Sequence, residues 1–324
     1  MAVVGVTPFC DVCHNDKIGS RTLVKFPMLV LVRILFLLLA GIYSVELSLA
    51  QLPFYTDDPA VTEQGTFHFE FFNEFDGLQS SQYPNLRQNT ANFKLNYGLP
   101  YRLELDVDSP YLSIFRTVGA QNSTGPGDVD LGIKWNFRSV SQTSHLPGLG
   151  VSLYIEFPTG NVRQQLSSGL TDYWLNFIVQ EPTSPRTKVN VNLGFLFAGN
   201  TSTGVVGIQT TRGHVYTGGL SLLRDFNRRL TLGGEVYGGI ADNSGLGRRQ
   251  LQGLVGGQYS IRNGFGLTFA LLGGKYEASP RIGGQLGFAV DFPAFLHSSA
   301  SKKTSSQSSR IDLPTFPFTQ RRSP

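Results

Sequence analysis

Pairs of acidic residues that could bind a cation recur at every second position in two stretches of the chain. Side chains two residues apart point to the same face of a β-strand, and facing residues on neighbouring strands come close enough to interact. Basic residues are predicted on the same face and can pair with the carboxylates, so we favour a network of ion pairs over a metal site. The acidic residues are Asp106, Asp108, Asp128 and Asp130, and the basic residues are Lys94, Arg102 and Lys134.

Histidine, serine and cysteine give little indication of catalysis. A Ser-His-Asp hydrolase site is the enzymatic alternative, but the sequence contains no Gly-x-Ser-x-Gly nucleophile turn. The segment from Cys10 to His14 has the spacing of a c-type haem attachment, yet it precedes the predicted export signal. We therefore expect no catalytic site, no cofactor and no metal. The histidines that follow residue 50 are far apart and are His68, His145, His214 and His297.

Alternation of apolar and polar residues predicts the elements that carry these side chains. Residues 103–108 read Leu-Glu-Leu-Asp-Val-Asp, a period of two that places one set of side chains on each face of a strand. The pattern repeats along the chain with turn residues between the segments. The predicted strands are residues 65–75, 88–97, 101–108, 127–138, 149–157, 171–179, 187–198, 214–224, 229–240, 249–259, 265–274 and 283–292.

The connections between these strands alternate between long and short. Odd-numbered connections such as 109–126 are long and even-numbered ones such as 99–100 are short, although 139–148 is longer than this scheme favours. Outer-membrane barrels have an even number of strands, long external loops and short periplasmic turns. Charges on adjacent strands could not fill the dry core of a soluble sandwich, where each unpaired charge is costly. Twelve antiparallel strands in an up-and-down transmembrane barrel, with both termini in the periplasm, fit the pattern.

The first 50 residues predict a cleaved export signal. Residues 34–45 form an apolar run after Arg33, and small residues precede a cleavage site before Gln51. A membrane-spanning helix is the alternative, but it needs about 20 apolar residues, and Arg33 and Glu46 bound a shorter run. Met28 would begin a signal peptide of ordinary length and is an alternative start.

Composition narrows the class of protein. The mean hydropathy of −0.06 excludes a bundle of many membrane helices, and a net charge of +4 without a basic stripe gives no support for nucleic-acid binding. Cysteine is confined to the predicted leader, which suits an oxidising periplasm. We predict a leader and signal peptide over 1–50, a periplasmic N-terminal segment over 51–64, the barrel over 65–292 and a disordered tail over 293–324.

Several stretches resemble the outer-membrane proteins grouped as the MetA-pathway phenol-degradation family. They are Thr56-Asp57-Asp58-Pro59 and residues 96–105, 125–135, 156–160 and 169–173. The likeness covers roughly residues 55–292. It implies an outer-membrane barrel that moves aromatic or other apolar small molecules.

The expected function is a passive channel across the outer membrane of a Gram-negative bacterium, for small and aromatic or hydrophobic molecules. The alternatives are a structural barrel with a plugged lumen and a secreted soluble β protein. Expected partners are outer-membrane lipid, the solute and the barrel assembly machinery, which would read Phe292 at the end of the last strand. The residues predicted to line the lumen are Glu70, Arg102, Glu104, Asp106, Asp128, Asp130, Lys134, Glu156, Lys188 and Glu235.

Overall fold

The computed structural model describes residues 53–140, 146–199, 212–242 and 249–294. The chain divides into two compact units, Met1–Gly41 and Ile42–Pro324, and all described residues belong to the second unit. The predicted leader and signal peptide, and the predicted tail beyond residue 294, lie outside the described residues. No helix in the described ranges is both long and apolar enough to cross a membrane.

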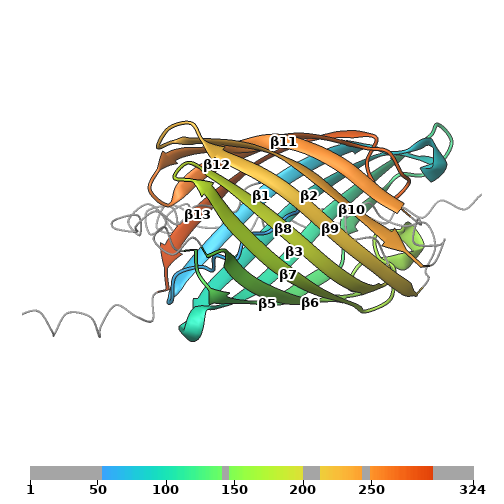
Figure 1. Cartoon of the computed structure of the whole chain (residues 1–324). Helices are drawn as coiled ribbons and strands as arrows, with labels where there is room; N and C mark the ends of the chain where they lie inside the picture. Colours follow the sequence, from blue (N-terminus) through green and yellow to red (C-terminus); the bar gives the residue numbers. More distant parts are fainter. Residues whose placement is uncertain (1–52, 141–145, 200–211, 243–248, 295–324) are drawn as a thin grey trace, which may run out of the picture. The chain divides into compact units, whose positions relative to one another are not determined.

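Twelve antiparallel strands of the described chain close into a barrel (Figure 1). Pairing of β1 with β13 completes the cylinder and sets Thr66 opposite Pro293. The predicted twelve-stranded up-and-down barrel is therefore confirmed. The strands are β1 (Thr66–Gly77), β2 (Asn85–Leu99), β3 (Leu103–Arg116), β5 (Val129–Arg138), β6 (Gly148–Phe157), β7 (Asp172–Ser184), β8 (Thr187–Ala198), β9 (Gly213–Asp225), β10 (Leu230–Ala241), β11 (Arg249–Arg262), β12 (Phe265–Gly274) and β13 (Ile282–Pro293).

The third strand is longer than predicted, and the expected loop over 109–126 is wrong. Ser109-Pro110 resembles a turn, yet β3 continues to Arg116. The first half of β3 pairs with β5, and its second half pairs with the short strand β4 (Ser123–Pro126). Proline has no N–H to donate to a sheet. Pro110 is accommodated because it lies at the break between β4 and β5, where the Gly127 N–H donates to its carbonyl at 2.9 Å.

The two ends of the barrel differ in their connections. We call the end at which Thr66 and Pro293 lie the turn end, and the opposite end the loop end. The turn end carries the short connections 100–102, 185–186, 226–229 and 263–264, with 139–147 as the longer exception. The loop end includes the connections 78–84, 158–171 and 275–281.

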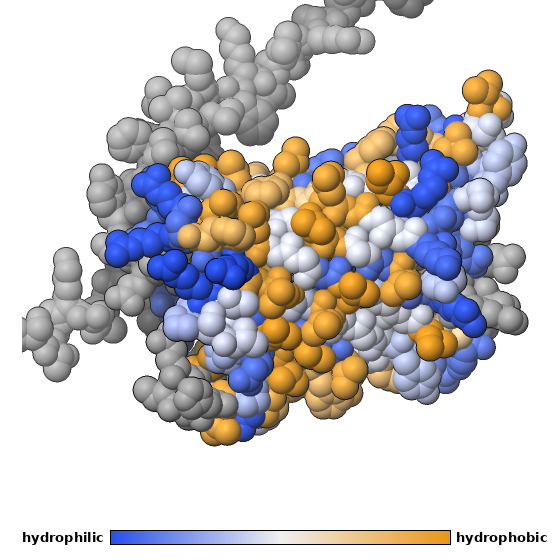
Figure 2. Space-filling model, turned by 45° about the horizontal axis from the view of Figure 1, so that its top comes forward, coloured by the Kyte–Doolittle hydropathy of each residue, from blue (hydrophilic) through white to orange (hydrophobic). Residues whose placement is uncertain are grey.

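The outer wall of the barrel is apolar. Figure 2 shows a band of hydrophobic residues across the visible face, with hydrophilic residues gathered toward both ends. Phe93, Leu220, Val236 and Leu271 project outward with 44, 55, 56 and 73% of their surface exposed. An apolar surface of this extent marks an interaction with another apolar medium, and tilted strands of about 10 residues span a bilayer. The fold is a transmembrane β-barrel.

Candidate functional site

The interior of the barrel is the candidate site, and its wall is polar. Glu70, Glu104, Asp106, Lys134 and Glu235 point inward and are between 0 and 8% exposed. Asp128, which lies between β4 and β5, is also buried and accepts a hydrogen bond from the Gly160 N–H at 2.9 Å. The strand alternation places the remaining predicted residues Asp130, Glu156 and Lys188 on the same inner wall, where they are half-buried.

Arg102 does not line the lumen, and its predicted place is corrected. The alternation was extended back to residue 101, but β3 begins only at Leu103. Arg102 ends the short 3-10 turn Pro100–Arg102 at the turn end, where it is exposed and has a φ of 61°. A residue in this left-handed conformation interrupts the strand, so its side chain does not follow the alternation of β3.

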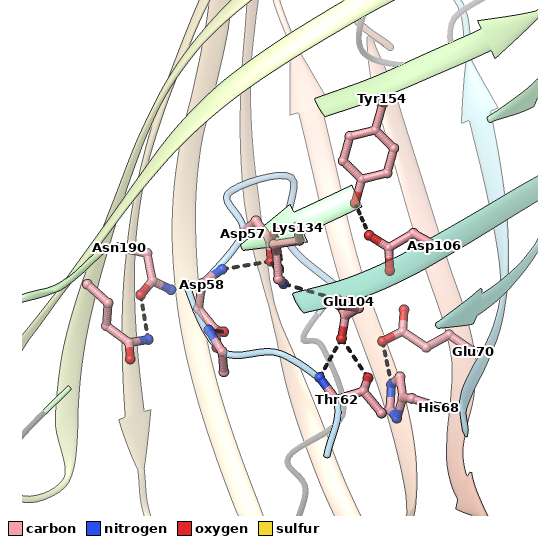
Figure 3. Close-up of polar contacts among 12 residues, drawn as sticks. Asp57, Asp58, Thr62, His68, Glu70, Glu104, Asp106, Lys134, Tyr154 and Asn190 are labelled. Carbon is pink, nitrogen blue, oxygen red and sulfur yellow. Dashed lines mark hydrogen bonds and ion pairs between the residues drawn. The ribbon is translucent and has the colours of Figure 1, made fainter. Parts of the chain in front are cut away.

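Residues 53–63, which we call the inner segment, lie inside the barrel. Residues 51–64 were predicted to be a periplasmic N-terminal segment. Four of its side chains, Phe54, Thr56, Asp57 and Thr62, are only 4–8% exposed. Figure 3 shows the segment surrounded by strands of the wall, with Asp57 and Thr62 directed at wall residues. The segment contacts opposite sides of the barrel and therefore obstructs the lumen.

Charged residues of the wall bind the part of the inner segment nearest to β1. The N–H and the hydroxyl of Thr62 donate to Glu104 Oε2 at 2.5 and 2.6 Å. The Lys134 ammonium lies 3.1 Å from Asp57 Oδ1 and 3.5 Å from Glu104 Oε1, so it links both carboxylates (Figure 3). On the opposite wall, Lys188 Nζ lies 3.7 Å from Asp58 Oδ2. Paired in this way, these buried charges avoid the cost of isolation.

Glu235 holds the middle of the inner segment. Its Oε1 accepts a hydrogen bond from the Tyr55 N–H at 3.1 Å, and its Oε2 accepts from the N–H and the hydroxyl of Thr56, both at 2.6 Å. The Tyr55 hydroxyl reaches across to β1 and donates to Glu74 Oε1 at 3.1 Å. The Tyr55 ring stacks on Tyr237 with 5.5 Å between the ring centroids.

An apolar cluster anchors the end of the inner segment. Phe54 packs with Leu223, Leu254, Ala270 and Leu272, which come from β9, β11 and β12 and are at most 5% exposed. Burial of a phenylalanine side chain stabilises a structure by about 1.5–3 kcal/mol. Phe54 is thus the main hydrophobic contribution to holding the segment in place.

Further polar contacts join the strands of the wall to one another. The Tyr154 hydroxyl donates to Asp106 Oδ2 at 2.9 Å, and its ring lies over Gly132, where a Cβ would overlap it. The His68 ring nitrogens lie 2.5 Å from Asp291 Oδ1 and 2.8 Å from Glu70 Oε1. No pattern in the sequence indicated that His68 pairs with Asp291, because the two residues are 223 positions apart and meet only when the barrel closes.

Ion pairs also connect strand ends at the loop end. Arg212 lies 2.9 Å from Asp172 and covers the Phe197 ring at 4.6 Å. The backbone N–H of His214 donates to Asp242 Oδ1 at 2.8 Å, and this hydrogen bond, with that of the His214 ring, lowers the pKa of the Asp242 carboxyl. Such contacts fix strand ends and involve no group of the inner segment.

Charge compensation organises the interior. Within the described ranges, no group of three or more His, Cys, Asp or Glu residues is arranged to hold a metal ion. Of the predicted acidic residues, Asp106 and Asp108 lie on β3 and Asp130 lies on its neighbour β5, whereas Asp128 directly precedes β5. Lys134, whose partners come from the inner segment as well as the wall, is the centre of the ion-pair network.

Fold and interior together define a polar-lined transmembrane barrel with an obstructed lumen. The chain belongs to the family described as "Putative MetA-pathway of phenol degradation", whose model matches residues 56–292. No curated protein matches the sequence.

Solved structures similar to this chain include other membrane barrels. The NanC porin is 10% identical, with 69% of this chain and 98% of that chain covered and a TM-score of 0.46. The KdgM porin in complex with disordered oligogalacturonate is 10% identical, with 69 and 98% covered and a TM-score of 0.45. The CymD monoaromatic hydrocarbon channel is 8% identical, with 71 and 88% covered and a TM-score of 0.37.

Proposed function

We propose that this protein is a passive channel for small molecules across the outer membrane of a Gram-negative bacterium. The observation that carries the proposal is a closed barrel with an apolar outer wall and a polar inner wall. A soluble protein gains nothing from an apolar exterior, whereas a membrane channel needs this inversion. The family description names phenol degradation, which favours small aromatic or hydrophobic solutes.

The inner segment closes this channel and must move for a solute to pass. It is held by hydrogen bonds and ion pairs to Glu104, Lys134 and Glu235, and by one apolar anchor, Phe54. Each hydrogen bond to these charged groups contributes only about 1.5–3 kcal/mol, because water replaces the lost partner when the segment leaves. A segment held mainly by such contacts can leave the lumen while the wall, whose strands pair all round, stays intact.

Orientation and assembly follow from the same proposal. The turn end faces the periplasm, and an export signal removed before Gln51 precedes the inner segment. Phe292 is the outward-facing aromatic residue at the end of β13, where it stacks on Phe67 with 5.5 Å between ring centroids. This is the place where the barrel assembly machinery would recognise the last strand.

Solute flux tests the proposal. The purified protein, and a variant without residues 53–61, would be placed in planar bilayers and in liposomes that contain a neutral aromatic solute. We expect rare conductance steps from the complete protein and frequent steps, with faster solute entry, from the variant. Migration on gels before and after heating controls for an intact barrel in both. A variant with an intact barrel that neither conducts nor admits solute would overturn the channel.

A structural barrel is the second candidate, because the inner segment obstructs the lumen in this conformation. In that case the segment would serve as a permanent part of the core. The same flux measurement separates the two candidates, since a structural barrel would lose stability without residues 53–61 and gain no conductance.

A further inference from the structure

Tyr55 is bound inside the barrel in the way that a small ligand would be bound. Its ring stacks on Tyr237 at an interplanar angle of 29° and packs against the apolar cluster that contains Phe54. Its hydroxyl donates to Glu74 at one end, and its backbone N–H donates to Glu235 at the other. The site therefore matches an aromatic ring with a hydrogen-bond donor at each end.

We propose that this interior site binds a phenolic amine when the inner segment leaves. The amine would take the place of the Tyr55 and Thr56 N–H groups at Glu235, the ring would stack on Tyr237, and the hydroxyl would reach Glu74. The proposal rests on the proposed channel function only in requiring that the inner segment can leave. We call the place formed by Glu74, Glu235, Tyr237 and the apolar cluster the ring site.

Charge selects a cationic ligand over an anionic one. Within the described residues, neither Glu74 nor Glu235 forms an ion pair with a lysine or arginine. Asp76 lies on the same inward face of β1 as Glu74 and adds a further carboxylate. An ammonium group at Glu235 would form charge-assisted hydrogen bonds, which are stronger than those of the neutral amide groups now bound there. A carboxylate in its place would be repelled.

The ring site admits a ligand only if Thr56 moves away from Glu235. A Cβ built at Gly219 lies 3.6 Å from the Thr56 Cβ, within the range of about 3.5–4.5 Å that disulfides require. The double variant T56C/G219C can therefore fix the inner segment in place with a disulfide, although the Tyr237 ring must shift slightly, because it lies 2.8 Å from the new Cβ. Both cysteines of the natural chain lie in the predicted leader, so a chain starting at Gln51 would contain only the two engineered ones.

Calorimetric binding of four related compounds to detergent-solubilised protein tests the ligand class. The probes are tyramine, phenethylamine without the hydroxyl, 4-ethylphenol without the amine, and 3-(4-hydroxyphenyl)propanoate with a carboxylate in place of the amine. The variant F54A/T56A serves as the background, because it weakens the inner segment and leaves Glu74, Glu235, Tyr237 and the wall residues of the apolar cluster unchanged. We expect tyramine to bind at least about tenfold more tightly than phenethylamine or 4-ethylphenol. The propanoate should not bind.

Two substitutions in this background separate the ring site from a general effect of carboxylates. E235Q should remove the preference for tyramine over 4-ethylphenol. E104Q is the matched control, because Glu104 also accepts hydrogen bonds from the N–H and hydroxyl of a threonine of the inner segment but lies outside the ring site. E104Q should leave the preference unchanged. In an otherwise natural background, oxidised T56C/G219C should bind no tyramine, and reduction should restore binding.

The proposal fails if the propanoate binds as tightly as tyramine, or if E104Q and E235Q affect the preference equally. It also fails if the oxidised disulfide variant still binds tyramine. Binding in detergent requires no transport, so its outcome is distinct from that of the flux experiment. Flux without a tyramine preference would support the channel and refute the ring site. Tyramine binding without flux would support the ring site and refute the channel.

Discussion

Replacing Glu235 by glutamine should loosen the inner segment and raise the open probability of the channel. The carboxylate accepts three hydrogen bonds, from the N–H of Tyr55 and from the N–H and hydroxyl of Thr56. Glutamine has one accepting oxygen, and its amide nitrogen would face a donor. The variant must therefore lose at least one charge-assisted hydrogen bond, worth about 1.5–3 kcal/mol. This loss corresponds to an increase of about 10- to 150-fold in the ratio of open to closed channels.

Single-channel recording in planar bilayers measures this ratio directly. The control is E181Q, because Glu181 belongs to β7 but its side chain faces away from the inner wall. We expect E235Q to lengthen the total open time by about tenfold or more, with the conductance of each open channel changed little, and E181Q to behave like the natural protein. An open probability of E235Q equal to that of E181Q would refute the view that Glu235 holds the segment.

Three further changes probe the anchor, the wall and assembly. F54A should destabilise the inner segment by about 3–5 kcal/mol, so chymotrypsin should cleave the segment after Tyr55 faster while the barrel resists, and equal cleavage rates in F54A and the natural protein would contradict the anchor role. G132A should force the Tyr154 ring away and cost the Asp106 hydrogen bond, which lowers stability by about 1–3 kcal/mol; unchanged urea unfolding would contradict this. F292A should slow the insertion of the barrel into proteoliposomes that contain the assembly machinery. The stability of the inserted barrel should fall by no more than the loss of one aromatic contact.

Alternation of side chains predicted the barrel because each strand carries the information locally. The outer face must be apolar and the inner face polar, so a period of two marks every strand. Residues 187–198 and 265–274 were predicted with the bounds of β8 and β12. The prediction failed after Asp108, where β3 continues to Arg116 and pairs with β4. It failed at Arg102 because the break before Leu103 depends on the backbone conformation of Tyr101 and Arg102.

The inner segment was not predicted, since nothing within it alternates. Asp57-Asp58-Pro59 reads as a turn, and the structure does show such local bonds, with the Asp58 N–H donating to Asp57 and the Ala60 N–H to Asp58. The same carboxylates also pair with lysines of the wall, which no local pattern reveals. Two adjacent aromatic residues, Phe54 and Tyr55, were the available signal, because a periplasmic linker has no reason to carry them.

Conductance of the T56C/G219C variant decides whether the inner segment closes a channel, because one recording on one set of inserted channels compares the closed and the released segment. With the disulfide formed, we expect no conductance steps, and addition of a reductant should restore steps of the size seen in the natural protein. The single variants T56C and G219C should conduct with and without the reductant. Equal conductance of the double variant before and after reduction would contradict the claim that this barrel is a channel closed by its own inner segment.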